Sequence, residues 1–590
     1  MRQLSRVLTV DLTKRSFEIE DRSDLFYGYL GGAGVGIKLL EEYCPKGADP
    51  LGPNNPIIFS VGPLVGLYPL ASKTVSMFKS PLTGNLGESH AGGRSAVAIR
   101  SADFGAIVIK GSSRTPIYLS ISDKGVRFKD ASALWGIMNS ITVGRIIREL
   151  EPGSGMRTIM RIGGAGEKLV KYACVTTETY RHFGRLGLGA VFGSKKLKAV
   201  CVHGNHSVEV KNRSEYRKTY DEIYNKAIAS PLMKKYHDYG TAANVMPLSL
   251  MRGLPTINLT ESSSEGAVKI SGEELAENHL GRRVACAHCP VACIHIATLR
   301  IPYETERFFY KTLMIPYDYE LIYALGSMLG VFDLEGMLRL IDEVEIFGMD
   351  AMSTGVVLAW ATEAQMKKLV TEKDTLGLTL IWGDYLTYLK AIRNIVKQPN
   401  DFYKQLAMGV ESASNVYGGG EYALSFGKNE MPGYHTGSIS ILSYLVGSRH
   451  SHLDAAGYSI DQSILKGDQI TTTEAVKKLL KEESWRQILS SLVVCFFARG
   501  IYDPETVVKT LKVAGINRST KELDKLGFEI LSLKNKFKVR EGFDPKNLRI
   551  PSRVFETASA RGTIDENEVK EAIDQYFDLL ENEEVQISNS

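Results

Sequence analysis

The hydrophobic pattern of this chain changes its period near residue 207. Before that point, short β-rich runs such as VLTVDL, PIIFSV, GAIVIKG and LKAVCVHG are bounded by Gly, Pro, Asn or Ser, as strands and turns are. From about Ser214 the apolar residues follow a helical period, as in SEYRKTYDEIYNKAIAS and DLEGMLRLIDEVEIFG. The pattern predicts an α+β fold, with a β-sheet N-terminal base domain followed by two mainly α-helical domains. We place the domains at 1–207, 208–422 and 423–590, and expect helices at 36–43 and 140–150 within the first.

Composition excludes several classes of protein. The 590 residues are 44% hydrophobic and 23% charged, which is typical of globular proteins and not of disordered or disulfide-stapled chains. The formal net charge is +4, and no dense basic run indicates a nucleic-acid partner. No apolar run approaches the roughly 20 residues that span a bilayer, and the N-terminus lacks the apolar core of a signal peptide. We therefore expect a cytoplasmic protein with no membrane partner.

Three of the seven cysteines lie within eight residues. Cys286, Cys289 and Cys293 form a C-x2-C-x3-C run, a spacing that lets three thiolates converge on one [4Fe–4S] cluster. The cluster needs a fourth ligand, which Cys495 in SSLVVCFFARG could supply. An odd cysteine count in a large chain also favours cofactor ligation in a reducing compartment over disulfides.

A structural zinc site is the main alternative for these cysteines. Four cysteines, or three with His288 or His295, would satisfy tetrahedral zinc. Zinc sites usually draw their ligands from two close pairs, whereas this chain offers a triple and one remote cysteine. The spacing favours iron–sulfur and leaves zinc open.

Three glycine-rich segments in the β-rich region suggest a cofactor with phosphate groups. They are LGGAGVG at 30–36, KSPLTGNLGESHAGG at 79–93 and FGRLGLGAVFGSKKLKAV at 183–200. None fits a dinucleotide or P-loop motif. Glycine lets backbone N–H groups approach a phosphate or a flat heterocycle, and Arg185, Lys195 and Lys196 could balance its charge. Each segment alone is better explained by a turn or bulge, but three beside a cysteine triple favour a large cofactor on the base domain.

These motifs, taken together, resemble the aldehyde:ferredoxin oxidoreductase family of tungsten enzymes. The likeness covers nearly the whole chain, in the family's order: YLGGAGVGIKLL, DPLGPNNPIIFSVGPL, KSPLTGNLGESHAGG, GRLGLGAVFGSKKLKAV, the cysteine triple, YELIYALGSM, GMDAMSTG, EMPGY and the distal cysteine. The resemblance implies a tungsten (or molybdenum) bis-molybdopterin, buried between the base domain and two helical domains. It also implies one [4Fe–4S] cluster ligated by Cys286, Cys289, Cys293 and Cys495.

The resemblance further implies a set of pterin contacts, some of them altered. The family's D-x-x-G-x-D motif falls on residues 345–350 with Glu345 in first place, whereas its D-x-x-G-L-C motif falls on 490–495 without the aspartate and the glycine, at Ser490 and Val493. Asp454 stands where the family has a lysine, Lys73 where it has an arginine and His90 where asparagine is usual. The residues implied to contact the cofactor are Lys73, His90, Gly92, Arg181, His182, Gly184, Arg185, Glu345, Met349, Asp350, Asp454, Ser490 and Val494.

Two further metals are found in the family. A magnesium ion bridges the pterin phosphates through backbone carbonyls that fall near His90 and His182, so a change of side chain need not abolish it. An iron that bridges dimers uses a glutamate aligned with Arg339. A guanidinium cannot ligate a metal, and we expect no such iron here.

Two side chains are implied at the reacting metal. The family glutamate of Y-E-x-x-x-x-L-G falls on Glu320, whose pKa would rise in a dry pocket so that it could exchange a proton near neutral pH. The alternative is a carboxylate that only stabilises a helix N-terminus. The family histidine falls on His452, by its following leucine, or on His450. It would hydrogen-bond the aldehyde oxygen or the oxo ligand of the metal.

The resemblance thus implies an enzyme that oxidises an aldehyde to a carboxylic acid. Electrons would pass through the [4Fe–4S] cluster to ferredoxin or to a ferredoxin-like small subunit, in a homo- or hetero-oligomer. One alternative is a low-potential reductase of an aromatic thioester or a carboxylic acid on the same scaffold. Another is a divergent electron-transfer subunit without competent pterin chemistry. The changes at Ser490, Val493 and Asp454 favour that last alternative, whereas Glu320, Asp350 and the four cluster cysteines oppose it.

Overall fold

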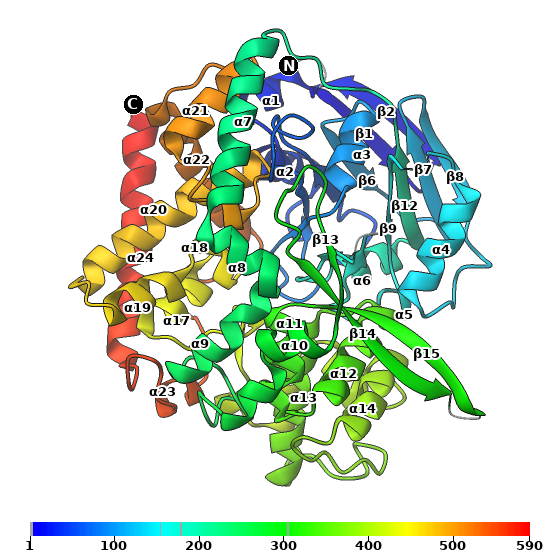
Figure 1. Ribbon diagram of the computed structural model, residues 1–590, viewed down its shortest axis with the longest axis vertical. Coiled ribbons are helices and arrows are strands. Elements are labelled where there is room, and N and C mark those ends of the chain that lie inside the picture. The colour runs from blue at the N-terminus through cyan, green and yellow to red at the C-terminus, as the bar shows by residue number, and fades with distance from the viewer. Residues whose placement is uncertain (1–3, 154, 178–179, 304–305, 590) are drawn as a thin grey trace.

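The computed structural model describes residues 4–153, 155–177, 180–303 and 306–589. Two six-stranded sheets form the N-terminal part of the chain, and the rest is mostly helical. Figure 1 shows the strands on one side of the molecule and the helices of the later residues beside and beneath them. The predicted α+β architecture is confirmed.

The first sheet has the strand order β2-β1-β6-β3-β4-β5. The β1–β6 pair is parallel and the other pairs are antiparallel. Its central strands are apolar runs buried on both faces, which is why the sequence shows them so clearly. The strands are β1 (Arg6–Asp11), β2 (Ser16–Asp21), β3 (Ile57–Ser60), β4 (Thr74–Lys79), β5 (Leu86–Ala91) and β6 (Ala106–Lys110).

The second sheet has the order β11-β10-β9-β12-β7-β8. Its edge strand β11 packs against β5, the edge of the first sheet, so the two sheets meet where the site is built. The strands are β7 (Ile117–Ser122), β8 (Gly125–Asp130), β9 (Arg157–Arg161), β10 (Val175–Thr176), β11 (His182–Phe183) and β12 (Leu197–His203).

Helices also cover these sheets, in greater number than the sequence pattern indicated. The predicted helix at 140–150 is present as α4, and the one expected at 36–43 begins earlier, at Gly32. A Cβ on Gly32 would lie 2.1 Å from the Ser490 carbonyl oxygen, so this glycine allows close packing. The helices are α1 (Ser23–Tyr29), α2 (Gly32–Tyr43), α3 (Ser95–Ser101), α4 (Ser140–Leu150), α5 (Gly164–Glu167) and α6 (Leu188–Ser194).

The remaining described residues are mostly helical, as the change of period predicted. The helices are α7 (Arg213–Ala229), α8 (Pro231–Tyr239), α9 (Val245–Leu250), α10 (Gly272–Asn278), α11 (Tyr319–Leu325), α12 (Leu334–Phe347), α13 (Ala351–Met366), α14 (Tyr385–Lys397), α15 (Asp401–Ala407), α16 (Val410–Tyr417), α17 (Ser438–Val446), α18 (His452–Ala455), α19 (Gly457–Leu465), α20 (Thr472–Ser491), α21 (Pro504–Val513), α22 (Thr520–Arg540), α23 (Arg553–Glu556) and α24 (Glu566–Asn589). Short 3-10 turns are η1 (Gly240–Asn244), η2 (Glu265–Ile270), η3 (Ser327–Leu329), η4 (Gly420–Tyr422) and η5 (Phe496–Ala498).

A three-stranded sheet interrupts this helical part, which the sequence pattern did not predict. Its β14–β15 hairpin projects beyond the body of the molecule (Figure 1). The run IHIATLRIPY alternates apolar and polar residues like a strand, but the long helical segments around it obscure that signal. The strands are β13 (Leu280–Val284), β14 (Ile294–Tyr303) and β15 (Glu306–Tyr317), and a separate short pair is β16 (Ser425–Phe426) and β17 (Asn429–Glu430).

The core of the β-sheet region draws on helices from the far end of the chain. Leu489, Leu492 and Ile530 are fully buried in the same apolar cluster as strands β1, β3 and β6. Leu489 lies in α20, Leu492 directly follows that helix and Ile530 lies in α22, and both helices pack against α2. The base of the site is therefore built from both ends of the chain.

Among the described residues, no single helix is long and apolar enough to cross a membrane. Two adjoining segments, Tyr319–Leu329 and Leu334–Phe347, meet that test only together, and they are bent by 117° at the break between them.

Candidate active site

The cysteine triple occupies the loop between β13 and β14. Cys289 N donates to the Cys286 carbonyl oxygen at 3.2 Å, which closes a turn. Cys495 follows α20, and its N–H donates to the Leu70 carbonyl oxygen at 2.8 Å. The four thiols are free. A Cβ on Gly92 would lie 2.8 Å from Cys286 Sγ, so this glycine lets the end of β5 approach the loop.

The four thiols lie close enough to influence one another. The pKa of Cys293 is raised to about 12, mainly by burial and also by the neighbouring Cys495 and Cys286, while Arg181 and Lys73 act in the opposite direction. Such thiols become thiolates only when a bound cationic centre compensates their charge. Burial opposes the charge of Arg181, yet the cysteines and Asp318 raise its pKa overall.

The geometry does not favour the zinc alternative. Over the described ranges, no group of three or more His, Cys, Asp or Glu side chains is arranged to hold a single metal ion. His295 is engaged elsewhere, because its Nε2 lies 2.9 Å from the His237 carbonyl oxygen and its Nδ1 lies 3.3 Å from the Tyr317 hydroxyl. His288 is exposed. A four-iron cluster needs its thiols farther apart than a single ion does, so this finding leaves it open.

Glu320 and His452 face each other in a buried space. Glu320 lies in the first turn of α11, where its Oε2 accepts from the Gly433 N–H at 3.1 Å. Its Oε1 lies 3.3 Å from His452 Nε2 and has no hydrogen bond to a described residue. Burial raises the pKa of Glu320 to about 8 and outweighs the Gly433 hydrogen bond. Burial also holds the pKa of His452 well below 6.5, with Arg185 and Arg449 adding to the effect. Both shifts favour the uncharged form of the group, the carboxyl of Glu320 and the imidazole of His452.

Aromatic rings enclose this pair on one side. The His452 ring lies 5.1 Å from that of Tyr434, which stacks on Tyr458 at 4.4 Å. His450 points elsewhere: its Nδ1 lies 2.8 Å from the Tyr444 carbonyl oxygen and its ring packs 5.4 Å from Phe543. Of the two candidate histidines, His452 is the one that the structure brings to Glu320.

The residues around 345–350 form a second set of contacts, which we call the Glu345 side. His182 Nε2 lies 2.8 Å from Glu345 Oε2 across the β11–α12 junction. Arg185 Nε donates to Asp350 Oδ2 at 3.1 Å, and its Nη2 donates to the Glu430 carbonyl oxygen at 2.7 Å. Arg185 Nη1 is buried without a hydrogen bond to a described residue. A buried guanidinium N–H group without a hydrogen-bond partner is suited to binding an anion.

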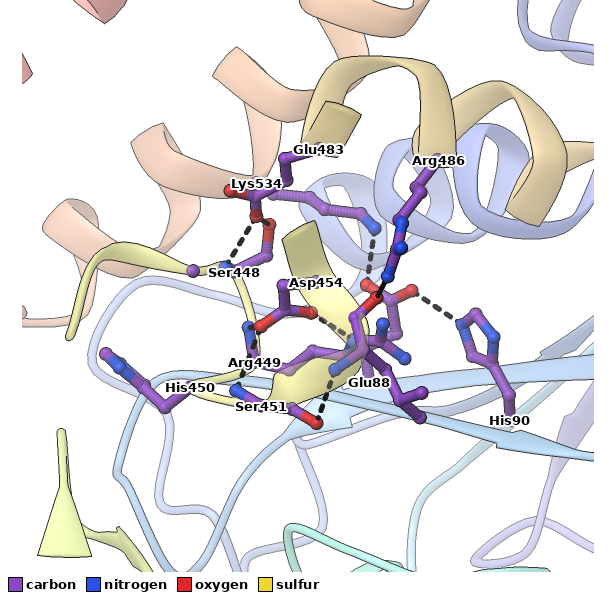
Figure 2. A network of polar contacts seen from close by, with 12 residues as sticks. Glu88, His90, Ser448, Arg449, His450, Ser451, Asp454, Glu483, Arg486 and Lys534 are labelled. Carbon is purple, nitrogen blue, oxygen red and sulfur yellow. Dashed lines mark hydrogen bonds and ion pairs between the residues drawn. The ribbon is translucent and has the colours of Figure 1, made fainter. Parts of the chain in front are cut away.

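The third set comprises Glu88, His90, Arg449, Asp454 and Lys534, which we call the Asp454 network (Figure 2). Glu88 Oε1 lies 2.7 Å from His90 Nε2, and Glu88 Oε2 lies 2.5 Å from Lys534 Nζ. Arg449 Nε donates to Asp454 Oδ1 at 2.6 Å. Sequence reasoning placed His90 and Asp454 at the site but missed the other three. Glu88 had a usable signal, because it precedes His90 by two on β5 and shares its face; Lys534 had none.

The remaining predicted contacts line the junction between α20 and the base domain. Lys73 N donates to the Val493 carbonyl oxygen at 3.2 Å. Ser490 and Val494 are buried at the end of α20. Two others, Met349 and Gly184, belong to the Glu345 side. Met349 forms an isolated antiparallel β-bridge with Ala173. The space beside Gly184 is open, because a Cβ at this residue would meet no atom within 4 Å. Arg339 lies away from the site, with its guanidinium 5.5 Å from the Tyr385 ring.

Comparison with known families covers nearly the whole chain. The model of the aldehyde ferredoxin oxidoreductase N-terminal domain matches residues 7–204, and that of domains 2 and 3 matches residues 218–584. The chain belongs to the aldehyde ferredoxin oxidoreductase family. The predicted family is therefore confirmed, and the protein is an oxidoreductase.

Individual relatives agree with this assignment. A tungsten-containing aldehyde ferredoxin oxidoreductase of Thermococcus kodakarensis is 32% identical, over 97% of this chain and 95% of that protein. The WOR-like subunit of an aliphatic sulfonate oxidoreductase of Pyrococcus furiosus is 26% identical, over 98% and 94%. The active-site complex BamBC of benzoyl coenzyme A reductase shares the fold, with a TM-score of 0.81 and 22% identity over 98% of this chain and 94% of that one.

The aldehyde ferredoxin oxidoreductase family implies a tungsten–pterin cofactor, and the described residues fit one. Arg185 Nη1, Glu320 Oε1 and His452 Nδ1 are buried polar atoms without hydrogen bonds to described residues. Buried polar atoms are rarely left unsatisfied in proteins. A large polar cofactor between the base domain and the helices would supply their partners.

Proposed function

We propose that this protein oxidises an aldehyde to a carboxylic acid. Aldehyde and water give the acid, two electrons and two protons, and a tungsten–pterin cofactor supplies this two-electron redox chemistry when bound. Cys286, Cys289, Cys293 and Cys495 would hold a [4Fe–4S] cluster, which would supply single-electron transfer to ferredoxin or a ferredoxin-like small subunit. The observation that carries the proposal is the buried Glu320–His452 pair.

Glu320 is suited to moving the proton of this reaction. With a pKa of about 8, it is a neutral acid at pH 7 and can still ionise at small cost, which is the condition for efficient general acid–base catalysis. Its Oε1 faces His452 Nε2 at 3.3 Å. If the carboxyl proton lies toward Nε2, the imidazole carries its hydrogen on Nδ1, which makes Nδ1 a donor for the carbonyl oxygen of the aldehyde. His452 thereby orients the substrate and Glu320 exchanges a proton with water or product.

Two flanking features support the same arrangement. Arg185, whose Nη1 has no described partner, would bind an anionic group of the cofactor on the Glu345 side. The packing of β11 against β5 brings the strands of His182 and His90 together. Backbone carbonyls there could hold a magnesium ion, since hard cations prefer oxygen ligands.

The decisive experiment is turnover by anaerobically purified protein from cells supplied with tungsten and molybdenum. Aldehydes of increasing size are offered with a viologen dye as acceptor. In Glu320→Gln, kcat should fall by about a hundredfold or more, as the loss of a general acid–base does, while metal and iron contents stay unchanged. His450→Gln is the matched control and should retain turnover.

Two outcomes would contradict the proposal. An unchanged kcat in Glu320→Gln would remove the role of that carboxyl. One relative is a subunit of an aliphatic sulfonate oxidoreductase, and the active-site complex of a benzoyl coenzyme A reductase shares the fold, so the same preparation is assayed with a sulfonate and an aromatic thioester. Turnover of either without any aldehyde oxidation would replace the proposed substrate.

A further inference from the structure

Both carboxylate oxygens of Asp454 accept hydrogen bonds from residues of its own segment of chain. Its Oδ2 accepts from the backbone N–H groups of Arg449 and Ser451 at 2.9 and 3.1 Å, and its Oδ1 accepts from Arg449 Nε at 2.6 Å. The residue is only 2% exposed. Asp454 therefore holds the turn that leads into α18, and its carboxylate faces Arg449. The family resemblance places a cofactor-binding lysine at this position, so the change from cation to anion needs a physical explanation.

Arg449 has donors left over after this contact. Only its Nε is bound to Asp454, and neither Nη group donates to a residue that the structure describes. The side chain is 9% exposed. Burial opposes its charge, but Asp454, Glu88 and Glu483 raise its pKa, so the guanidinium stays charged. A buried guanidinium with unused Nη donors is geometrically suited to a bidentate contact with an oxyanion.

The other charges of the Asp454 network are already matched. Glu88 is neutralised by Lys534 at 2.5 Å, and Lys534 Nζ also donates to Gln487 Oε1 at 2.5 Å. Figure 2 shows Arg449 beside Asp454, with Glu88, His90 and Lys534 grouped around it. Arg449 is the cation of this network that keeps hydrogen-bonding capacity for a ligand.

The unused Nη donors of Arg449 lie between the Glu320–His452 pair and the region of Cys495. Arg449 precedes His452, which faces Glu320, by three residues. On the other side, His90 packs 6.3 Å from Phe496, the residue after Cys495. Arg486 joins these two regions, because its Nη1 donates to the Leu453 carbonyl oxygen at 2.8 Å and its guanidinium lies 5.2 Å from the Phe496 ring. A cofactor that links Glu320 to the cysteines would pass along this side.

We infer that Arg449, positioned by Asp454, binds a phosphate oxygen of the pterin cofactor on the Cys495 side and replaces the lysine of the family. The cation is moved by five residues along the chain, and the aspartate at the former lysine position fixes the new one. Asp454 is a positioning residue and not a ligand. The inference rests on the tungsten–pterin cofactor of the proposed function and adds to it how this chain retains that cofactor.

The test uses two double variants that differ only in the charge at residue 454. Arg449→Met/Asp454→Asn removes both charges together and leaves no unpaired ion in the interior. Arg449→Met/Asp454→Lys restores a single cation at the family's position. Tungsten, molybdenum, phosphorus and iron per chain are measured by elemental analysis after anaerobic purification and exhaustive dialysis. Circular dichroism and thermal unfolding confirm that each variant is folded.

The neutral variant should hold about tenfold less tungsten and phosphorus than the wild type, as the loss of a charge-assisted hydrogen bond predicts, with iron unchanged. The lysine variant should recover most of both. Arg553→Met/Glu363→Gln, a buried pair elsewhere with its atoms 2.7 Å apart, is the control and should retain the cofactor.

Several results would overturn the inference. Wild-type tungsten and phosphorus in the neutral variant would show that Arg449 does not bind the cofactor. Failure of the lysine variant to recover them, or loss of iron in parallel, would show that the charge itself is not what matters. If the wild type holds neither tungsten nor molybdenum, the proposed function is wrong and this inference falls with it; metal in the wild type and in the neutral variant alike refutes this inference alone.

Discussion

Two carboxyl groups in the interior of this protein have pKa values shifted in opposite directions, although the Glu320 side chain is only 14% exposed and that of Glu88 only 1%. Glu320 faces a neutral imidazole, and burial raises its pKa to about 8. Glu88 faces Lys534 at 2.5 Å, and although burial acts in the same direction, Lys534 and His90 hold its pKa below the usual range. The segment from Arg449 to Asp454 serves both regions, because His452 meets Glu320 while Arg449 and Asp454 belong to the network. Burial alone does not set the charge of a carboxyl group; the nearest cation does.

The largest expected effect comes from removing the cation of Glu88. Lys534→Met leaves Glu88 buried with only His90 as its partner, in a situation like that of Glu320. Unpairing a buried ion typically costs about 3–5 kcal/mol of folding free energy. Guanidinium unfolding of Lys534→Met should show a loss of that size. Glu88→Gln/Lys534→Met should recover most of it, and a double variant as unstable as the single one would refute the ion pair as the cause.

A smaller effect is expected from pH at Glu320. Its folded pKa of about 8 lies above the unfolded value of 4.5, so between these values the folded state binds more protons and stability falls as pH rises. As the pH rises from 6 to 8, ionisation of this single group should lower the free energy of unfolding by about 2 kcal/mol. The measurement is the difference in unfolding free energy between wild type and Glu320→Gln across this range, because the difference cancels the other titrating groups. A constant difference would mean that Glu320 is already ionised.

The smallest effect on the free energy of unfolding is expected from the Tyr576 hydroxyl, which is bound to the buried carboxylate of Glu483. Tyr576 donates to Glu483 Oε2 at 2.7 Å, while Glu483 Oε1 keeps the backbone and hydroxyl donors of Ser448 at 2.9 and 2.7 Å. Tyr576→Phe should therefore destabilise by only about 1 kcal/mol, measured by thermal unfolding, and leave turnover unchanged. A loss as large as that of Lys534→Met would show that hydroxyl donors matter as much as the cations.

Some predictions from sequence depended on short local patterns. The helix at 140–150, the strand runs and the cysteine triple each need only a few neighbouring residues, and the structure contains them. The β14–β15 hairpin was missed because its alternating pattern lies inside a long helical stretch. The division near residue 422 and the roles of the pterin contacts stay predictions.

At Asp454 and at the two candidate histidines, the sequence alone does not show which partner each side chain contacts. Asp454 reads as a lost cofactor contact when it is compared with the family's lysine. In the structure its carboxylate accepts hydrogen bonds from Arg449 and from the Ser451 backbone N–H. The cation in this part of the site is therefore Arg449 and not a lysine at residue 454. The sequence offers both His450 and His452, and only the fold places His452 beside Glu320 and the ring of His450 against Phe543.

The sequence by itself determined the α+β order of the chain and its family, because motifs of adjacent residues carry that information, whereas the roles of Glu320 and the four cysteines stay predictions. The tertiary structure alone decided which buried groups are charged. Glu88 and Lys534 are separated by more than four hundred residues and come from an edge strand and from helix α22. Their electrostatic energy depends on a distance of 2.5 Å through space, and only the packing of the helices on the sheets sets that distance.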